Sequence, residues 1–217
     1  FKTSQPSPQE FLDIFEEVKE KQETLICLSL SSKLSGTYQS ACLAKDMVDY
    51  ENIYIVDTLT AAAGIRLLCE VAMNWIDENR SVESIVSGLE ELKERVHIYA
   101  GLDTLEYLAK GGRISKTAAT IGTLASIKPI ICTDHGDVAV AGKTRGVNKA
   151  TSIVCEKMQA DIVDTLYPVY TLYSYGVENV EKLESKLDCD VERVRIGSTI
   201  GVHIGPNAFG VCFVGEL

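Results

Sequence analysis

The sequence predicts an α/β protein of two domains, a parallel-sheet α/β/α domain over residues 1–96 and a mixed-sheet α/β domain over residues 97–217. Three observations carry this prediction. The first half alternates short apolar runs with amphipathic segments, which is typical of parallel strands covered by helices on both faces. The second half contains two apolar runs joined by a short polar turn, which indicates an antiparallel hairpin. The length of 217 residues lies between the values expected for one and two domains.

The first half begins with a well-marked helix. Ser7, Pro8 and Glu10 supply an N-cap, a first-turn proline and an N3 glutamate, and apolar residues then recur at helical spacing. Strands, polar loops and helices follow in turn. The predicted elements are a strand over Leu25–Leu30, a helix over Thr37–Val48, a strand over Ile53–Val56, helices over Ala61–Asp77 and Val82–Glu94, and a strand over Val96–Ala100.

The second half has a different sequence pattern, which includes a glycine pair and predicts short helices and strands of mixed direction. The hairpin strands are expected over Ile127–Thr133 and Val138–Ala141. The other predicted elements are helices over Thr104–Ala109, Ser115–Leu124, Gly146–Ala160 and Asn179–Leu187, and strands over Val169–Ser174, Val191–Ile196 and Val211–Val214.

Composition and charge exclude several classes of protein. The 21 Lys and Arg against 31 Asp and Glu give a net charge of −10, which argues against nucleic acid as a partner. No window reaches the ~18 apolar residues of a membrane span, so we expect no stable membrane insertion. Seven cysteines without a CxxC pair fit a reducing cytoplasm. The chain starts at Phe1 without a signal-peptide pattern, and we interpret it as truncated.

Two motifs resemble known sites but have the wrong spacing or context. Between Gly136 and Gly142-Lys143-Thr144 there are five residues, whereas a phosphate-binding loop requires four. The intervening Val138–Ala141 is also strand-like. Asp134, His135 and Asp137 could bind a metal, but neighbouring residues of a tight turn point apart and no fourth ligand is evident. We therefore predict no metal and no cofactor here.

A small-molecule enzyme remains an alternative. The sequence contains no GxSxG elbow. Among the histidines only His203, in the glycine-rich segment Gly201–Pro206, could serve as a base for a loop serine. A serine hydrolase or a ketone-binding, kinase-like domain would use it in this way.

Small hydroxyl and glycine residues gather in four loops. In a parallel α/β sheet, loops beyond the carboxyl ends of the strands converge on a crevice, where hydroxyls and helix N-terminal amides suit a small anion. Taken singly, Ser7 and Ser35 could be helix caps and Arg113 a surface charge. The loops are Thr3–Ser7, Ser31–Thr37, Gly111–Ser115 and His203–Pro206.

These loops, with Leu105, Leu108 and Ile127-Lys128-Pro129-Ile130, form four motifs in order along nearly the whole chain. In this combination the sequence resembles the DegV family of bacterial fatty-acid-binding proteins. Members of the family carry an upstream first strand with a Thr-Asp-Ser turn. The sequence has no counterpart of that strand, so we expect the first domain to lack it.

The resemblance implies a long-chain fatty acid held between the two domains. Thr3 and Ser35, with the Gly36 amide, would bind the carboxylate, and Arg113 and His203 would lie near this head group. The resemblance also implies a non-catalytic subunit of fatty acid kinase, which presents the acid to an ATP-binding partner for acyl phosphate formation in phospholipid metabolism. The family is reported to share its fold with the substrate domain of dihydroxyacetone kinase, where a histidine binds a ketone.

The energetics agree with such a ligand. Burial of about 15 methylenes contributes on the order of 10 kcal/mol before costs, whereas a hydrogen bond to a carboxylate contributes about 1.5–3 kcal/mol. The tail would therefore set the affinity and the head-group residues the orientation.

Overall fold

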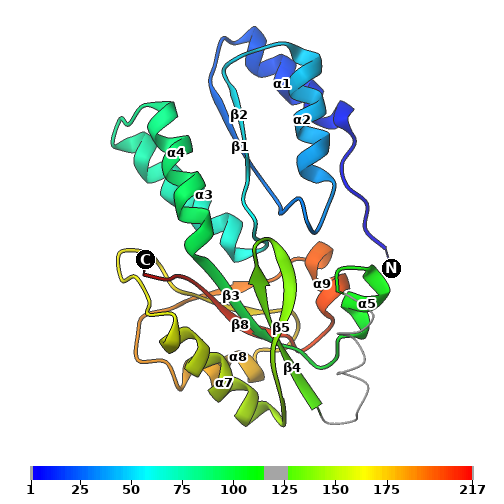
Figure 1. Ribbon diagram of the computed structural model, residues 1–217, viewed down its shortest axis with the longest axis vertical. Coiled ribbons are helices and arrows are strands. Elements are labelled where there is room, and N and C mark those ends of the chain that lie inside the picture. The colour runs from blue at the N-terminus through cyan, green and yellow to red at the C-terminus, as the bar shows by residue number, and fades with distance from the viewer. Residues whose placement is uncertain (1, 115–126, 217) are drawn as a thin grey trace. The chain divides into compact units, whose positions relative to one another are not determined.

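The computed structural model describes residues 2–114 and 127–216, so the predicted helix over residues 115–124 lies outside the described part (Figure 1). The described residues form two compact units. One, here called the parallel unit, consists of Ser4–Ala61 and Ile65–Glu94. The other, the mixed unit, contains the described residues from Arg95 onward together with Lys2, Thr3 and Ala62–Gly64.

The parallel unit opens with α1 (Pro8–Glu20), whose start follows the expected capping pattern. The Glu10 amide donates to Ser7 Oγ over 3.4 Å, and the Ser7 amide donates to the Glu10 carboxylate over 2.7 Å. These two bonds satisfy amides that would otherwise lack a partner at the helix end. Burial of Leu12, Phe15 and Val18 turns one face of the helix toward the core. The predicted helix start is confirmed.

Two parallel strands form the sheet of this unit. β1 (Leu25–Ser29) pairs with β2 (Ile53–Asp57), in register from Leu25 opposite Ile53 to Ser29 opposite Asp57. The connection between them is α2 (Thr37–Val48), which packs beside α1 (Figure 1). The chain continues through α3 (Ala63–Asp77), α4 (Val82–Leu92) and the 3-10 turn η1 (Lys93–Arg95). The strand, loop and helix order expected from the sequence is confirmed.

The mixed unit is built on a six-stranded sheet in the order β5-β4-β3-β8-β6-β7. All neighbouring pairs are antiparallel except β6 and β7, which are parallel. The predicted hairpin is confirmed, with His135 and Gly136 forming its two-residue turn at φ angles of 44° and 90°. The strands are β3 (Val96–Gly101), β4 (Ile127–Asp134), β5 (Asp137–Arg145), β6 (Tyr170–Tyr173), β7 (Glu192–Arg195) and β8 (Phe209–Val214).

Helices cover both faces of this sheet, because its central strands bury side chains on both sides. Phe209, Val211 and Phe213 of β8 face a core shared with α7 (Val147–Ala160) and α8 (Glu178–Glu184). The opposite core contains Ala208 and side chains of α5 (Glu106–Gly111) and α9 (Ser198–Ile204). Helices α5 and α9 therefore lie next to each other (Figure 1).

Helix α9 was not predicted from the sequence. Gly197, Gly201 and Gly205 make the segment read as a glycine-rich loop, since glycine lowers helix propensity. In the structure, Ile200 and Ile204 are four residues apart and pack into the same apolar core. This tertiary contact outweighs the local propensity. The placement of His203 in a loop is therefore wrong, because His203 lies in the last turn of α9.

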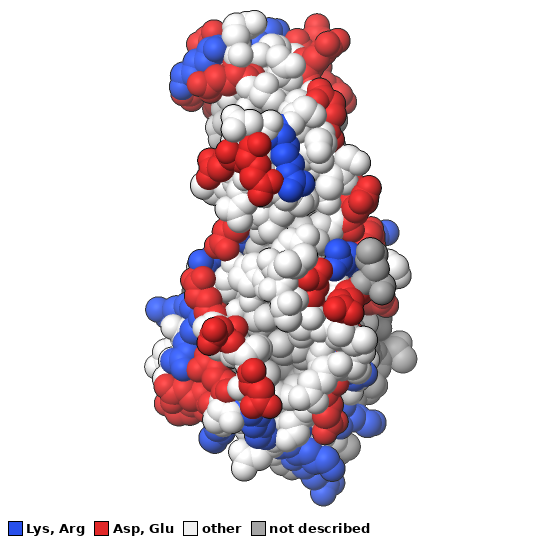
Figure 2. Space-filling model, turned by 90° about the vertical axis from the view of Figure 1, so that its left-hand side faces the viewer, with Lys and Arg blue, Asp and Glu red and all other residues white. Residues whose placement is uncertain are grey.

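Neither the charged surface nor the cysteines indicate a functional site. No helix among the described residues is long and apolar enough to cross a membrane. Acidic and basic side chains are interspersed on the face shown in Figure 2. All seven cysteines are free thiols. Cys155 and Cys212 are buried as expected of small apolar residues, whereas Cys189 is exposed.

Candidate functional site

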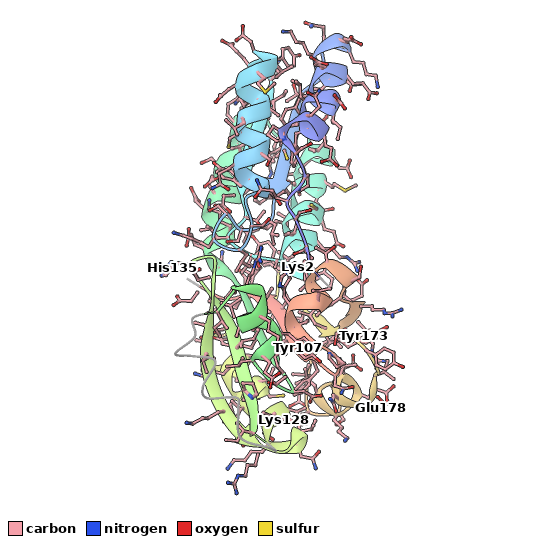
Figure 3. All side chains as sticks on the ribbon, turned by 90° about the vertical axis from the view of Figure 1, so that its right-hand side faces the viewer. Lys2, Tyr107, Lys128, His135, Tyr173 and Glu178 are labelled. Carbon is pink, nitrogen blue, oxygen red and sulfur yellow. The ribbon has the colours of Figure 1, made fainter. Side chains whose placement is uncertain are left out.

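A pocket of about 990 Å³ lies within the mixed unit. One wall is formed where β6 and β7 end, because these parallel neighbours, with Tyr173 opposite Arg195, bring their carboxyl ends to the same edge of the sheet. The other wall is formed by α5 and α9. Two of the lining residues, Lys2 and Tyr107, are labelled in Figure 3.

Inside the pocket the structure joins Thr3 to His203. The Thr3 Oγ1 atom lies 2.7 Å from His203 Nε2, although the two residues are 200 positions apart. Both side chains are partly buried. The family resemblance implied that Thr3 binds the carboxylate and that His203 lies near the head group, but it did not predict the bond between them.

The protonation of His203 decides what this pair can do. Burial lowers the pKa of His203, and the nearby Arg113 guanidinium lowers it further, so the ring is neutral at pH 7. Its Nδ1 atom is buried without a hydrogen-bond partner among the described residues. The tautomer with its proton on Nε2 avoids burying an N–H donor without a partner. In that tautomer His203 donates to Thr3, and the Thr3 hydroxyl keeps its own hydrogen for an anion.

Two glycines allow α5 and α9 to approach closely enough to form this wall. A β-carbon on Gly111 would lie 2.3 Å from His203 Nδ1, and one on Gly205 would lie 2.4 Å from the Tyr107 ring. Gly205 also has a φ of 78°, which favours glycine. Each ring therefore packs directly on the backbone of the opposite helix segment. This gives a physical reason for a glycine in the Gly111-Gly112-Arg113 motif and for another in the His203–Pro206 motif.

Arg113 lines the same pocket, directly after α5 ends. Gly112 closes the helix in a left-handed conformation, with a φ of 73°, which turns the chain so that Arg113 leaves the helix axis. One guanidinium nitrogen of Arg113 donates to the Gly111 carbonyl over 2.5 Å. Thr3, Arg113 and His203 are thus brought together as the sequence analysis expected of them, although their contact with a ligand stays a prediction.

Ser35 and Gly36 belong to the parallel unit, at the start of α2. Gly36 is the N-cap residue, so the alternative interpretation of Ser35 as the N-cap is wrong. Ser35 Oγ lies 2.9 Å from Thr37 Oγ1 and accepts from the Thr37 amide over 3.3 Å. The N-cap residue Gly36 has no side chain to cap the helix, and helix N-terminal amides suit an anion. The predicted carboxylate role of Ser35 and Gly36 stays a prediction.

Gln5 supports this loop and was missed as a functional residue. Its side-chain amide packs on Gly36, where a β-carbon would lie 1.9 Å from Gln5 Oε1, and its Nε2 donates to Ser40 Oγ over 3.2 Å. The available signal was the position of Gln5 within the Thr3–Ser7 motif.

The pocket also contains cations that the sequence analysis did not single out, namely Lys2, Lys110 and Arg195. Lys2 precedes Thr3 and Lys110 precedes the glycine pair, so adjacency to the motifs could have indicated them. Arg195 carries no such signal. It reaches the pocket only because β7 pairs in parallel with β6.

The two motifs that the sequence analysis rejected as functional sites lie in a strand and in a turn. Residues 137–145 form strand β5, so the phosphate-loop resemblance lies in a hairpin strand. His135 lies at the turn, where its Nε2 is 3.9 Å from Asp134 Oδ1 and its side chain is 87% exposed (Figure 3). No group of three or more potential metal ligands occurs in the described ranges. His203 bonds to a threonine, and within those ranges no serine bonds to its ring.

Comparison with known proteins agrees with this fold. Residues 1–216 match the model of a family described as "Uncharacterised protein, DegV family". A DegV domain-containing protein of Caldanaerobacter subterraneus is 35% identical over 97% of this chain and 78% of its own length. A solved DegV family protein of Thermus thermophilus, whose description reports fatty acid binding, is 31% identical with a TM-score of 0.88, covering 99% of this chain and 79% of its own.

A second solved structure carries a named ligand. A protein of Eubacterium ventriosum described as a stearic acid-binding protein is 27% identical, with a TM-score of 0.87, and the match covers 99% of this chain and 78% of that one. The sequence motifs, the two sheets and these matches agree, and the chain belongs to the DegV family.

Proposed function

We propose that this chain binds a long-chain fatty acid and presents its carboxylate to an ATP-binding kinase partner, which converts it to an acyl phosphate. The observation that carries the proposal is the Thr3–His203 bond inside a pocket that holds Arg113. This arrangement offers a hydroxyl donor and a fixed positive charge to one anion. The fatty acids named for the related structures identify the class of anion.

The head-group residues would share the work of binding a carboxylate. In the proposal, the hydroxyls of Thr3 and Ser35 and the Gly36 amide each donate one hydrogen bond to a carboxylate oxygen. A charge-assisted bond of this kind contributes about 1.5–3 kcal/mol. The neutral His203 orients Thr3 without adding a charge of its own.

The reaction at this head group would belong to the partner. A carboxylate oxygen attacks the γ-phosphorus of ATP, the bond from that phosphorus to the β,γ-bridging oxygen breaks, and ADP leaves. No proton has to be removed from the attacking group, because the acid is already ionised. This chain's contribution is to hold the carboxylate in place, and Arg113 would offset the charge that gathers as the two anions approach.

A non-catalytic role is favoured over the enzyme alternatives. A serine hydrolase would require a base next to a serine, and the Nε2 atom of His203 is engaged by Thr3. A histidine that attacks a ketone needs a free nitrogen facing the pocket, whereas Nδ1, the His203 nitrogen without a hydrogen-bond partner among the described residues, is buried against Gly111. We therefore expect no turnover of ATP or esters by the chain alone.

Arg113→Ala tests whether binding of the fatty acid and presentation of its carboxylate to the kinase partner depend on different residues. Affinity for palmitate, measured by displacement of a fluorescent fatty acid from delipidated protein, is expected to fall only slightly. Acyl phosphate formation in the presence of a fatty acid kinase subunit and ATP is expected to fall by about tenfold or more, since a cation near the reacting anion is lost. Lys149→Ala, which removes an exposed cation from α7 outside the pocket, is the matched control.

Two outcomes would contradict the proposal. Delipidated protein that takes up no fatty acid would remove the binding function. Acyl phosphate formed by the isolated chain with ATP, at a rate that survives a change of purification route, would remove the requirement for a partner.

A further inference from the structure

The pocket of the mixed unit is lined by more positive charge than one carboxylate needs. Lys2, Lys110, Arg113 and Arg195 all contribute to its walls. Asp and Glu make up 31 of the 217 residues of the chain, yet none of them lines this pocket among the residues that the structure describes. The protein as a whole is acidic, so a pocket lined by cations without acidic residues concentrates positive potential at one place. Such a pocket favours an anionic ligand.

Two of these four cations, Lys2 and Arg195, have side chains without a partner among the described residues. In the described ranges neither side chain forms a hydrogen bond or an ion pair, and both side chains are exposed. Lys110 pairs with Glu106 over 3.2 Å, but its side chain is 76% exposed, and such surface pairs contribute little. These like charges repel one another until an anion enters.

Arg195 belongs to a different element from the carboxylate residues. Arg195 is the last residue of β7, beside the end of β6, whereas Thr3 bonds to His203 of α9. Ser174 and Tyr175 follow β6 at the same edge and line the pocket with Arg195. The pocket thus contains a guanidinium fork and the Lys2 ammonium in addition to the Thr3 hydroxyl.

We propose that Arg195 and Lys2 form a phosphoryl-group site, which binds the phosphate of the acyl phosphate produced on the bound acid. The inference rests on the proposed function, since that function supplies the acyl phosphate. A phosphoryl group adds three acceptor oxygens and almost two negative charges to the head group. The planar fork of an arginine matches such oxygens in pairs, and a lysine adds a point charge. The product would then be bound more tightly than the acid.

The test compares two ligands of the same chain length. One is palmitate, and the other is a phosphonate analogue of palmitoyl phosphate in which a methylene replaces the bridging oxygen, so that it cannot be hydrolysed. Each displaces a fluorescent fatty acid from delipidated protein at constant ionic strength. We expect the wild-type chain to bind the phosphonate about tenfold more tightly, the effect of one added charge-assisted hydrogen bond.

Arg195→Gln is expected to remove most of this tenfold preference and to change palmitate affinity much less. Lys2→Gln should act in the same direction with a smaller effect, because its single ammonium is more flexible. Lys149→Gln, an exposed cation of α7 outside the pocket, controls for the loss of one positive charge and should leave the preference intact.

Three results would overturn the inference. Equal affinities of the wild-type chain for palmitate and the phosphonate, or a preference that survives Arg195→Gln, would show that these cations do not bind the phosphoryl group. Inorganic phosphate or ATP that binds without an acyl chain and depends on Arg195 would assign the site to a free phosphate instead. Failure of palmitate itself to bind would refute the proposed function, which distinguishes the two claims.

Discussion

Thr3 and Ser35 offer the same hydroxyl group to the proposed ligand, but the protein holds them in different ways. Ser35 bonds to Thr37, two residues further along the same turn. Thr3 bonds to His203, which is brought to it by the fold across 200 positions. A locally held hydroxyl depends on one turn, whereas Thr3 depends on the packing of α5 against α9. The two halves of the proposed carboxylate site should therefore respond differently to mutation.

The loops around these residues differ in the same sense. In the parallel unit, the Asp57 carboxylate accepts from the amides of Ser32 and Leu59 at 3.0 and 3.2 Å, while the buried Thr60 Oγ1 has no hydrogen-bond partner among the described residues. In the mixed unit, His203 Nδ1 likewise lacks a partner among those residues, and cations line the pocket wall. The feature particular to the mixed unit is therefore the positive charge of its pocket wall.

The largest effect is expected from Gly111→Ala, which breaks the packing that positions Thr3. The new β-carbon would lie 2.3 Å from His203 Nδ1, so the ring must move. We expect the free energy of unfolding in urea to fall by about 1–3 kcal/mol, as for other overpacked sites, and fatty acid affinity to fall with it.

Gly201→Ala is the matched control on α9. A β-carbon at this position would have no described atom within 4 Å outside its own helix turn, and alanine favours a helix by about 0.5–1 kcal/mol over glycine. The two substitutions should therefore change stability in opposite directions. Equal stability of both variants would contradict the close approach of α5 to α9.

Replacement of the two hydroxyls should act on ligand binding rather than on stability, and it separates the two loops. Thr3→Val and Ser35→Ala should each weaken fatty acid binding by about 1.5–3 kcal/mol, the contribution of one hydrogen bond to a carboxylate. Only Thr3→Val should also shift the nuclear magnetic resonance titration of His203, because Ser35 does not contact that ring. A shift of similar size in both variants would remove the distinction between the loops.

The smallest effect is expected from pH. Burial lowers the pKa of His203, with Arg113 adding to it, and burial also lowers the pKa of His97 against the opposing charge of Asp161. A histidine whose folded pKa lies below its unfolded value of about 6.5 is more protonated in the unfolded chain. Stability should therefore decline as the pH falls from about 7 through 6.5.

Urea unfolding between about pH 7.5 and 5.5 measures this slope, and His203→Gln should reduce it while leaving the part that His97 contributes. An unfolding free energy that rises on acidification in this range would contradict the assigned pKa directions.

The sequence predicted more of the parallel unit than of the mixed unit, for physical reasons. Ser7, Pro8 and Glu10 specify the start of α1 by local hydrogen bonds, and α2 has the predicted limits of Thr37 and Val48. Helix α9 was missed because its glycines disfavour a helix and its stability comes from distant apolar contacts. Arg195 was missed for the same reason, since strand pairing alone brings it to the pocket.

The candidate residues were found through their motifs, but the arrangement of the site was not. The resemblance of the motifs to the DegV family indicated Thr3, Ser35, Gly36, Arg113 and His203 as one set. It could not indicate which pairs touch, because the Thr3–His203 bond and the packing of His203 on Gly111 depend on the whole mixed unit.

The most direct test of the central claim is the identity of lipid carried by the protein itself. The chain is purified from a bacterial host, denatured, extracted with organic solvent and analysed by mass spectrometry, with Thr3→Val and Lys149→Ala prepared in parallel. The account predicts stoichiometric long-chain fatty acid in the wild-type and Lys149→Ala proteins and less in Thr3→Val. Absence of fatty acid from all three, together with no uptake of added fatty acid by the folded wild-type protein, would contradict it.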